Sequence, residues 1–288
     1  MKTTPLTPEF WIAEWNASQE RMALLARQGY TGRDLWNRMA SEYGGGRTND
    51  SYHKSETEGL VARLTEYGLL RPRFRVLDVG CGPGGKALAF AGHGADVVAL
   101  DFSEKMLDRL RRSVPADLAG SVEPVEADWE DVDLADRGWE GVFDLVFVSM
   151  TPGVRTPEAF LKLHRASRHG CYFRGWAGRR TDVLLAGLWR HLKDEPMPPM
   201  CGDIVQAFNL LYAMGLSPRI EFSKIGWATR EPVAKTSAFC RTFFADMTNL
   251  NAAELGARID GYLSSVAQDG QVLRKTEGRI GTMTWEVA

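Results

Sequence analysis

Glycines and aspartates near residue 80 have the types and the spacing of a nucleotide-binding site. Residues 75–101 read RVLDVGCGPGGKALAFAGHGADVVALD, with four glycines among the six residues 80–85. Glycine lets the backbone turn tightly and lie directly against a ligand, because it has no Cβ atom. Asp78 precedes the first glycine by two residues, and Asp101 follows it after about 20 residues, the spacing of a ribose-binding carboxylate. The pattern predicts a strand, a glycine loop, a helix whose N-terminus faces a ligand, and a second strand.

The glycine spacing leaves two classes of cofactor open. Gly80, Gly82 and Gly85 fit the dinucleotide pattern GxGxxG, whereas Gly80, Gly82 and Gly84 fit GxGxG. A carboxylate at Asp78 would repel a pyrophosphate and attract an ammonium group. S-adenosylmethionine (SAM) carries an α-amino group and a sulfonium and no phosphate, so it is the favoured ligand. An NAD-dependent oxidoreductase is the alternative.

Several segments extend this interpretation beyond the loop. DVGCGPG (residues 78–84) resembles motif I of the class I SAM-dependent methyltransferases. The resemblance continues through ALDFSEKML (99–107), EADW (126–129) and FDLVFVSM (143–150), and covers roughly residues 75–176. It implies an α/β fold with a doubly wound, mostly parallel seven-stranded sheet and an antiparallel last strand. It also implies SAM as cofactor and S-adenosylhomocysteine (SAH) as product.

The resemblance also implies roles for individual residues. The glycine loop and Asp78 would hold the methionine half of SAM, and Asp101 the ribose hydroxyls. Asp128 and the backbone at Trp129 would lie at the edge of the adenine. The predicted cofactor-binding residues are Tyr43, Asp78, Gly80, Cys81, Gly82, Gly84, Asp101, Phe102, Met106, Asp128, Trp129 and Ser149.

No catalytic residue and no metal site is predicted. Methyl transfer from a sulfonium is an in-line displacement with a good leaving group, and orientation alone can contribute roughly 7–11 kcal/mol. A general base is needed only where the nucleophile must lose a proton. The four cysteines lie far apart, without the spacing of metal ligands.

The flanking segments are expected to cover this site. Apolar periodicity predicts helices near 8–28, 31–43 and 54–69, which together would form a helical cap over residues 1–70. Residues 71–288 would form the SAM-binding domain, with a helical insertion at about 181–215. Further strands are expected at 122–127, 143–149, 170–176 and 219–230, and the antiparallel last strand within 278–288.

Composition limits the possible partners. The chain has 288 residues, 44% of them hydrophobic and 25% charged, and a net charge of −2. No overall basic field would attract nucleic acid or an anionic membrane. Neither a signal-peptide pattern nor a long apolar run occurs, so a cytoplasmic location is expected.

The predicted function is methyl transfer from SAM to a small-molecule acceptor. Residues 149–152 read SMTP, whereas methyltransferases that act on nucleic-acid bases often have an Asn/Asp-Pro-Pro-aromatic motif there. Two alternatives stay open: a regulatory module that binds SAM or SAH without turnover, and a nucleic-acid methyltransferase. The sequence assigns neither the acceptor nor the oligomeric state.

Overall fold

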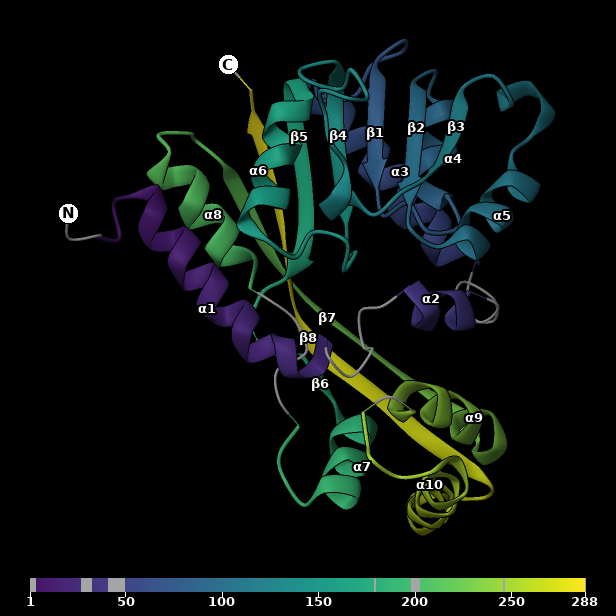
Figure 1. Cartoon of the computed structure of the whole chain (residues 1–288). Helices are drawn as coiled ribbons and strands as arrows, with labels where there is room; N and C mark the ends of the chain where they lie inside the picture. Colours follow the sequence, from purple (N-terminus) through teal and green to yellow (C-terminus); the bar gives the residue numbers. More distant parts are fainter. Residues whose placement is uncertain are drawn as a thin grey trace.

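A parallel sheet with helices on both faces forms the main body of the protein (Figure 1). The computed structural model describes residues 4–26, 33–40, 50–178, 180–197, 203–245 and 247–287. The parallel strands are β1 (Arg75–Val79), β2 (Asp96–Asp101), β3 (Val122–Glu126), β4 (Phe143–Ser149) and β5 (Ser167–Trp176). Their spatial order is β3-β2-β1-β4-β5. The order reverses between β1 and β4, and ligands of such sheets bind at the carboxyl ends of the strands at this point.

Three later strands extend the sheet beyond β5. β8 (Gln271–Glu286) runs antiparallel to β5, and β7 (Arg219–Pro232) runs antiparallel to β8. The two-residue strand β6 (Thr181–Asp182) also pairs with β8. The predicted doubly wound, mostly parallel fold with an antiparallel last strand is confirmed. The predicted count of seven strands is wrong: the described residues form an eight-stranded sheet, because the two-residue strand β6 also pairs with β8. β8 nevertheless begins at Gln271, well before the predicted start of the last strand near residue 278.

Apolar side chains of the two sheet faces meet different helices. α1 (Pro8–Ala26), α6 (Pro157–Ala166) and α8 (Ile204–Ala213) pack on one face. α3 (Asp50–Glu66), α4 (Gly85–Gly92) and α5 (Glu104–Ser113) pack on the other. Alternate residues of each strand supply the two cores, as the period of two in a strand requires.

A second group of helices has a core of its own. β7 and β8 continue past the sheet as a two-stranded ribbon, against which α7 (Val183–Lys193) and α9 (Val233–Phe244) pack (Figure 1). α10 (Ala252–Val266) packs on α9 and α7. We call these three helices and the paired segments 225–232 and 271–278 the ribbon lobe. Its buried side chains include Leu188, Phe244 and Ile259.

The two helices of the predicted insertion pack in different places. α7 contributes to the core of the ribbon lobe, whereas α8 packs on α1 and on the main sheet. The division into a cap and a SAM-binding domain with one insertion therefore stays a prediction. Among the described residues, no helix is long and apolar enough to cross a membrane.

The short helix α2 (Arg33–Met39) connects the two bodies. Ser103, the N-cap of α5, donates a hydrogen bond from Oγ to Asn37 Oδ1 at 2.7 Å. Met39, at the other end of α2, packs against the core of the ribbon lobe. Within the predicted helix at 31–43, α2 covers Arg33–Met39 and Ala40 lies in a turn, whereas residues 31–32 and 41–43 lie outside the described residues.

We predict that Gly281→Ala destabilises the protein. A Cβ atom at Gly281 in β8 would lie 2.5 Å from Cγ2 of Ile204, which is 3% exposed. Because β-branched side chains are stiff in helices, the expected loss in the free energy of unfolding is about 1–3 kcal/mol. Urea denaturation measures this loss.

Gly261→Ala in α10, where a Cβ would meet nothing within 4 Å, is the control and should stabilise the protein by about 0.5–1 kcal/mol. Equal stability of Gly281→Ala and the unchanged protein would contradict the packing of α8 on β8.

Candidate functional site

The glycine loop between β1 and α4 is held against the end of β2. The backbone N–H groups of Gly80 and Cys81 both donate to the carbonyl oxygen of Leu100, at 2.8 and 3.0 Å. Gly80, Gly82 and Gly84 have φ values of 71°, 55° and 86°. These left-handed conformations are readily adopted only by glycine. The glycine pattern therefore follows from the shape of the loop.

The three glycines differ in what a side chain would meet. A Cβ atom would lie 2.1 Å from Thr151 Oγ1 at Gly80, and 2.1 Å from Leu110 Cδ1 at Gly84. At Gly82 it would meet nothing within 4 Å. Gly80 and Gly84 thus make room for side chains of the protein itself, whereas Gly82 borders open space.

Asp101, at the end of β2, fixes the loop and the start of α5. Its Oδ2 accepts a hydrogen bond from the N–H of Gly82 and its Oδ1 one from the N–H of Ser103, each at 2.8 Å. The carboxyl group is 7% exposed, and burial raises its pKa although these hydrogen bonds act in the opposite direction. Each carboxylate oxygen can accept more than one hydrogen bond, so Asp101 can still receive ribose hydroxyls.

Asp78, at the end of β1, carries a buried oxygen without a partner. The residue is 2% exposed, and no group in the described part of the chain donates to its Oδ2. Burial, followed by the charge of Asp101, raises the pKa of Asp78 to about 7, although Lys86 acts in the opposite direction. An unsatisfied buried acceptor costs free energy. A ligand that brings a cationic donor would remove this cost.

Polar groups of α3 lie over the same edge of the sheet. Lys86, in the first turn of α4, donates from Nζ to Thr57 Oγ1 at 2.7 Å, and burial lowers its pKa. Arg174 of β5 pairs with Glu56 at 2.7 Å. Ser149, the predicted site residue at the end of β4, lies opposite Arg174 in the register of the sheet.

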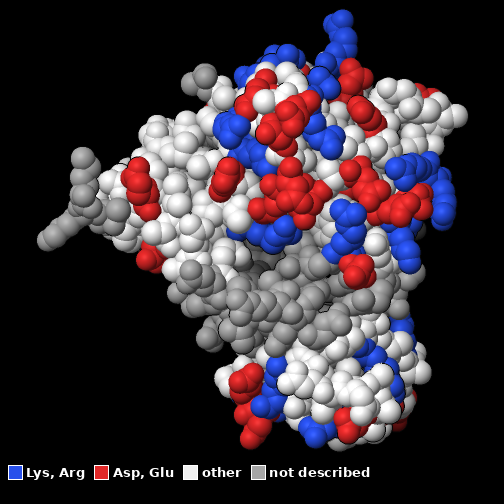
Figure 2. Space-filling view, in the orientation of Figure 1, with Lys and Arg blue, Asp and Glu red and all other residues white. Residues whose placement is uncertain are grey.

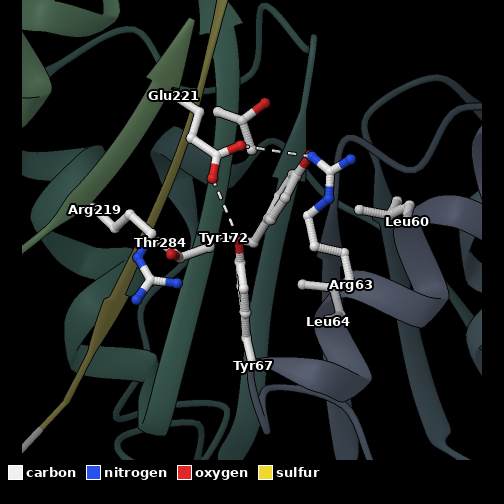
Figure 3. Close-up of a pocket in the computed structure, with 9 residues that line it drawn as sticks. Leu60, Arg63, Leu64, Tyr67, Tyr172, Arg219, Glu221 and Thr284 are labelled. Atoms are coloured by element: carbon white, nitrogen blue, oxygen red, sulfur yellow. Dashed lines mark hydrogen bonds and ion pairs between the residues drawn. The ribbon is translucent and has the colours of Figure 1, made fainter.

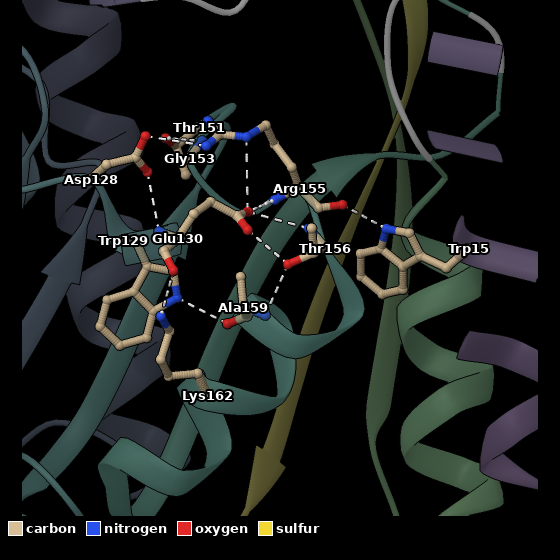
Figure 4. A network of polar contacts seen from close by, with 10 residues as sticks. All are labelled: Trp15, Asp128, Trp129, Glu130, Thr151, Gly153, Arg155, Thr156, Ala159 and Lys162. Carbon is tan, nitrogen blue, oxygen red and sulfur yellow. Dashed lines mark hydrogen bonds and ion pairs between the residues drawn. The ribbon is translucent and has the colours of Figure 1, made fainter. Parts of the chain in front are cut away.

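Asp128 belongs to a polar network that joins three parts of the chain (Figure 4). Its Oδ2 accepts from Arg155 Nη2 at 3.1 Å, and its Oδ1 from the N–H of Glu130 at 3.1 Å. Glu130 in turn accepts from the N–H of Arg155 at 2.6 Å and from Thr156 Oγ1 at 2.7 Å. Trp15 of α1 donates from Nε1 to the carbonyl oxygen of Arg155 at 2.8 Å. The network connects the loops after β3 and β4 to helix α1.

Two predicted site residues have side chains that are almost fully covered by protein. Trp129 is 1% exposed, donates from Nε1 to the carbonyl oxygen of Ala159 at 2.9 Å, and has Lys162 Nζ 5.1 Å from its ring centroid. Met106 is 2% exposed, and its N–H is bound by the Ser103 hydroxyl. Only the backbone of Trp129 can therefore face a ligand, as the predicted adenine contact requires.

The structure brings most of the predicted site together. Asp78 and Asp101 lie at the carboxyl ends of β1 and β2, and Asp128 lies just after β3, so the three acids share one edge of the sheet. The loop residues and Phe102 lie at the same edge, and Cys81 and Phe102 are 9% and 6% exposed. Tyr43 lies outside the described residues.

Sequence reasoning missed the groups that surround these acids. Lys86 could have been found, because it follows the glycine loop directly. Glu56, Thr57 and Arg174 come from segments with no motif, and no signal in the sequence places them near Lys86.

The sequence matches known methyltransferases over this region. Residues 76–170 match a family described as "Methyltransferase domain". A malonyl-[acyl-carrier protein] O-methyltransferase of Enterobacter lignolyticus is 32% identical over 163 residues, which are 56% of this chain and 59% of that protein. A cypemycin N-terminal methyltransferase of a Streptomyces species is 33% identical over 135 residues, 47% of this chain and 44% of that protein. The chain thus spans about half the length of these relatives.

A solved structure aligns with part of this chain. The magnesium protoporphyrin IX methyltransferase of Synechocystis with bound SAH aligns at a TM-score of 0.48 and 21% identity, over 69% of this chain and 91% of that one.

Residues 76–170 are thus similar to a methyltransferase domain. Of the two cofactor classes that the glycine spacing left open, the match favours SAM. The site fits this cofactor in two respects: Asp78 has a buried acceptor for which the described residues supply no donor, and Gly82 borders open space.

We predict that Asp78→Asn stabilises the cofactor-free protein at pH 8 by about 1–3 kcal/mol. The pKa of Asp78 is raised from 3.8 to about 7. Between these two pH values, Asp78 is protonated in the folded state and ionised in the unfolded state. The contribution of Asp78 to stability therefore falls as the pH rises from 4 to 7, and the amide avoids this loss. Urea denaturation at pH 5 and pH 8 measures the effect. A destabilisation of equal size at both pH values would contradict it.

Proposed function

We propose that this protein transfers the methyl group of SAM to a small-molecule acceptor at the carboxyl edge of the parallel strands. The observation that carries the proposal is the unpartnered, buried Oδ2 of Asp78 at the end of β1. An ammonium group would supply both the missing donor and the opposite charge. The matching methyltransferase domain supports the same function.

Each of the three acids at the strand ends binds a different part of the cofactor. Asp78 accepts from the amino group of the methionine half, and the backbone of the glycine loop lies along that half. Asp101 accepts from the ribose hydroxyls while its bonds to Gly82 and Ser103 keep the loop in place. Asp128, with the backbone of Trp129, receives the adenine. Arg155 orients Asp128 through the ion pair at 3.1 Å.

The residues around the site contribute by positioning. When bound, SAM supplies an activated methyl group on a sulfonium. The fixed loop and the strand ends hold the donor side, and orientation of this kind can contribute roughly 7–11 kcal/mol. Thr151, which packs on Gly80, and Trp176, at the end of β5, border the side from which an acceptor would approach. No general base is assigned.

Charge supports a small molecule as the acceptor. The net charge of the chain is −2, and on the face shown in Figure 2 basic and acidic side chains are interspersed. Nucleic acid requires several basic groups along its phosphates. The names of the relatives include acceptors as different as malonyl-[acyl-carrier protein] and the N-terminus of cypemycin, so the acceptor atom stays open. A cytoplasmic location also stays a prediction.

We predict that Gly82→Val abolishes both SAM binding and formation of SAH. The branched side chain would fill the open space beside the loop, and a φ of 55° is unfavourable for valine. Isothermal titration with SAM measures the first effect, and SAH production with a panel of small alcohols, amines and carboxylic acids the second.

The matched control is Gly92→Ala at the end of α4, where a Cβ also meets nothing within 4 Å; it should bind SAM normally. Normal affinity in Gly82→Val would contradict the placement of the cofactor. If the unchanged protein binds SAM and forms no SAH with any acceptor, the regulatory alternative replaces the enzyme.

A further inference from the structure

β7 forms an outer edge of the sheet along its whole length. None of its 14 residues is buried, and it pairs with β8 alone among the described strands. Phe222 and Trp227 are 50% and 36% exposed. Long exposed edge strands are usually shortened or covered, because their free N–H and C=O groups can pair with another chain. In the described part of the chain nothing covers this edge with hydrogen bonds.

The outer edge of β7 is also regular. Its pairing with β8 runs residue by residue from Arg219↔Thr284 to Pro232↔Gln271 without a bulge. In an antiparallel ladder, alternate residues turn their N–H and C=O groups to the same side. Every second residue of β7 therefore offers a donor and an acceptor to an incoming strand.

This regularity restricts how β7 could pair with a second β7. Across a two-fold axis, outward-facing residues must lie opposite outward-facing residues. This condition holds only if the axis passes through a residue, so that this residue faces its own copy. The axes that pair most of the strand pass through Lys224, Ile225 or Gly226.

Charge selects one of these three axes. An axis at Lys224 places two ammonium groups directly opposite each other, and an axis at Gly226 places Glu221 opposite Glu231. Like charges in facing positions destabilise a sheet. An axis at Ile225 opposes no like charges and pairs residues 219–231 throughout.

Side-chain size favours the same axis. With Ile225 facing its own copy, the three other large side chains in the centre of the strand each lie opposite a small one, which allows close packing of these facing pairs. The facing pairs are Phe222 with Ala228, Trp227 with Ser223, Lys224 with Gly226, and Ile225 with Ile225. The exposed Phe222 and Trp227 would then be covered.

The ends of the strand are compatible with this register. Arg219 would face Glu231 of the second copy. The guanidinium of Arg219 lies over the ring of Tyr67 at 4.7 Å and has no ion-pair partner among the described residues (Figure 3). Glu231 already pairs with Lys235 at 3.2 Å and Arg274 at 3.4 Å. Arg219 of the second copy would add a third cation to this cluster, so its contact with Glu231 would contribute little to the stability of the interface.

We propose that β7 is the interface of a homodimer in which two copies of this strand pair in antiparallel fashion with Ile225 on the two-fold axis. The two sheets then continue into one another through β7. The partner is a second copy of this chain, because the strand is complementary to itself in both charge and size at one permitted register.

Disulfide trapping tests the register. Cys81, Cys171 and Cys240 are buried, so the variants are made with Cys201→Ser to remove the cysteine outside the described residues. Ile225→Cys places two thiols at facing positions, where Cα atoms are about 4.5–5.5 Å apart, within the range of a disulfide. Lys224→Cys is the control, because its two copies are offset along the strands. The distance between their Cα atoms exceeds the limit of about 7 Å for a disulfide.

Under mild oxidation we expect a covalent dimer from Ile225→Cys and a monomer from Lys224→Cys on a non-reducing gel. A covalent dimer from Lys224→Cys would overturn the register, and so would the absence of a covalent dimer from both variants.

The mass in solution tests the dimer independently. Light scattering on the unchanged protein should give twice the chain mass of 32.1 kDa. Ile225→Lys should return the monomer mass, because two ammonium groups would face each other at the axis. Val266→Lys, at the end of α10 where Val266 is 40% exposed, should stay dimeric. A monomeric unchanged protein, or a dimeric Ile225→Lys variant, would overturn the proposal.

Discussion

A buried carboxylate that lacks a compensating donor is the constraint on which the candidate site depends. Asp78 is 2% exposed, and its Oδ2 has no partner in the described part of the chain. Removing a charge from water is costly unless it is paired, and the pKa of about 7 expresses that cost. Asp101 acts on the site in two ways. Its charge raises the pKa of Asp78, and its hydrogen bond to the N–H of Gly82 holds the glycine loop beside the open space at that residue. The cofactor-free protein thus holds unfavourable free energy that a cationic ligand can release.

Elements distant in sequence hold this site in shape. Trp15 of α1 bonds to Arg155, which orients Asp128, and Asn37 of α2 bonds to the N-cap of α5. α2 also packs against the ribbon lobe. The lobe therefore connects, through α2, to the helix that begins beside Asp101. A shift of α2 would therefore move the start of α5, next to Asp101 at the edge of the sheet where the cofactor would bind. The helices of the ribbon lobe are in this way physically connected to the candidate site.

Local patterns predicted the fold well, and long-range contacts were out of reach. The glycine loop and the strand ends at Asp78 and Asp101 could be predicted because each depends on neighbouring residues. The pairing of Arg174 with Glu56 and of Arg155 with Asp128 joins segments without a motif. The outer half of β8, QVLRKTE at 271–277, has weak apolar alternation, so the ribbon lobe was not predicted. Trp129 shows that a motif position can serve both the core and the site.

The most direct test of the central claim is the pH dependence of cofactor affinity. Isothermal titration between pH 5.5 and 7.5 would compare SAM with an analogue that lacks the α-amino group. In this range the amino group of SAM is largely protonated, whereas Asp78 ionises near pH 7. The affinity for SAM should rise by up to about tenfold per pH unit, and that for the analogue should not rise. An equal pH dependence for both ligands would contradict the pairing of Asp78 with the ammonium group.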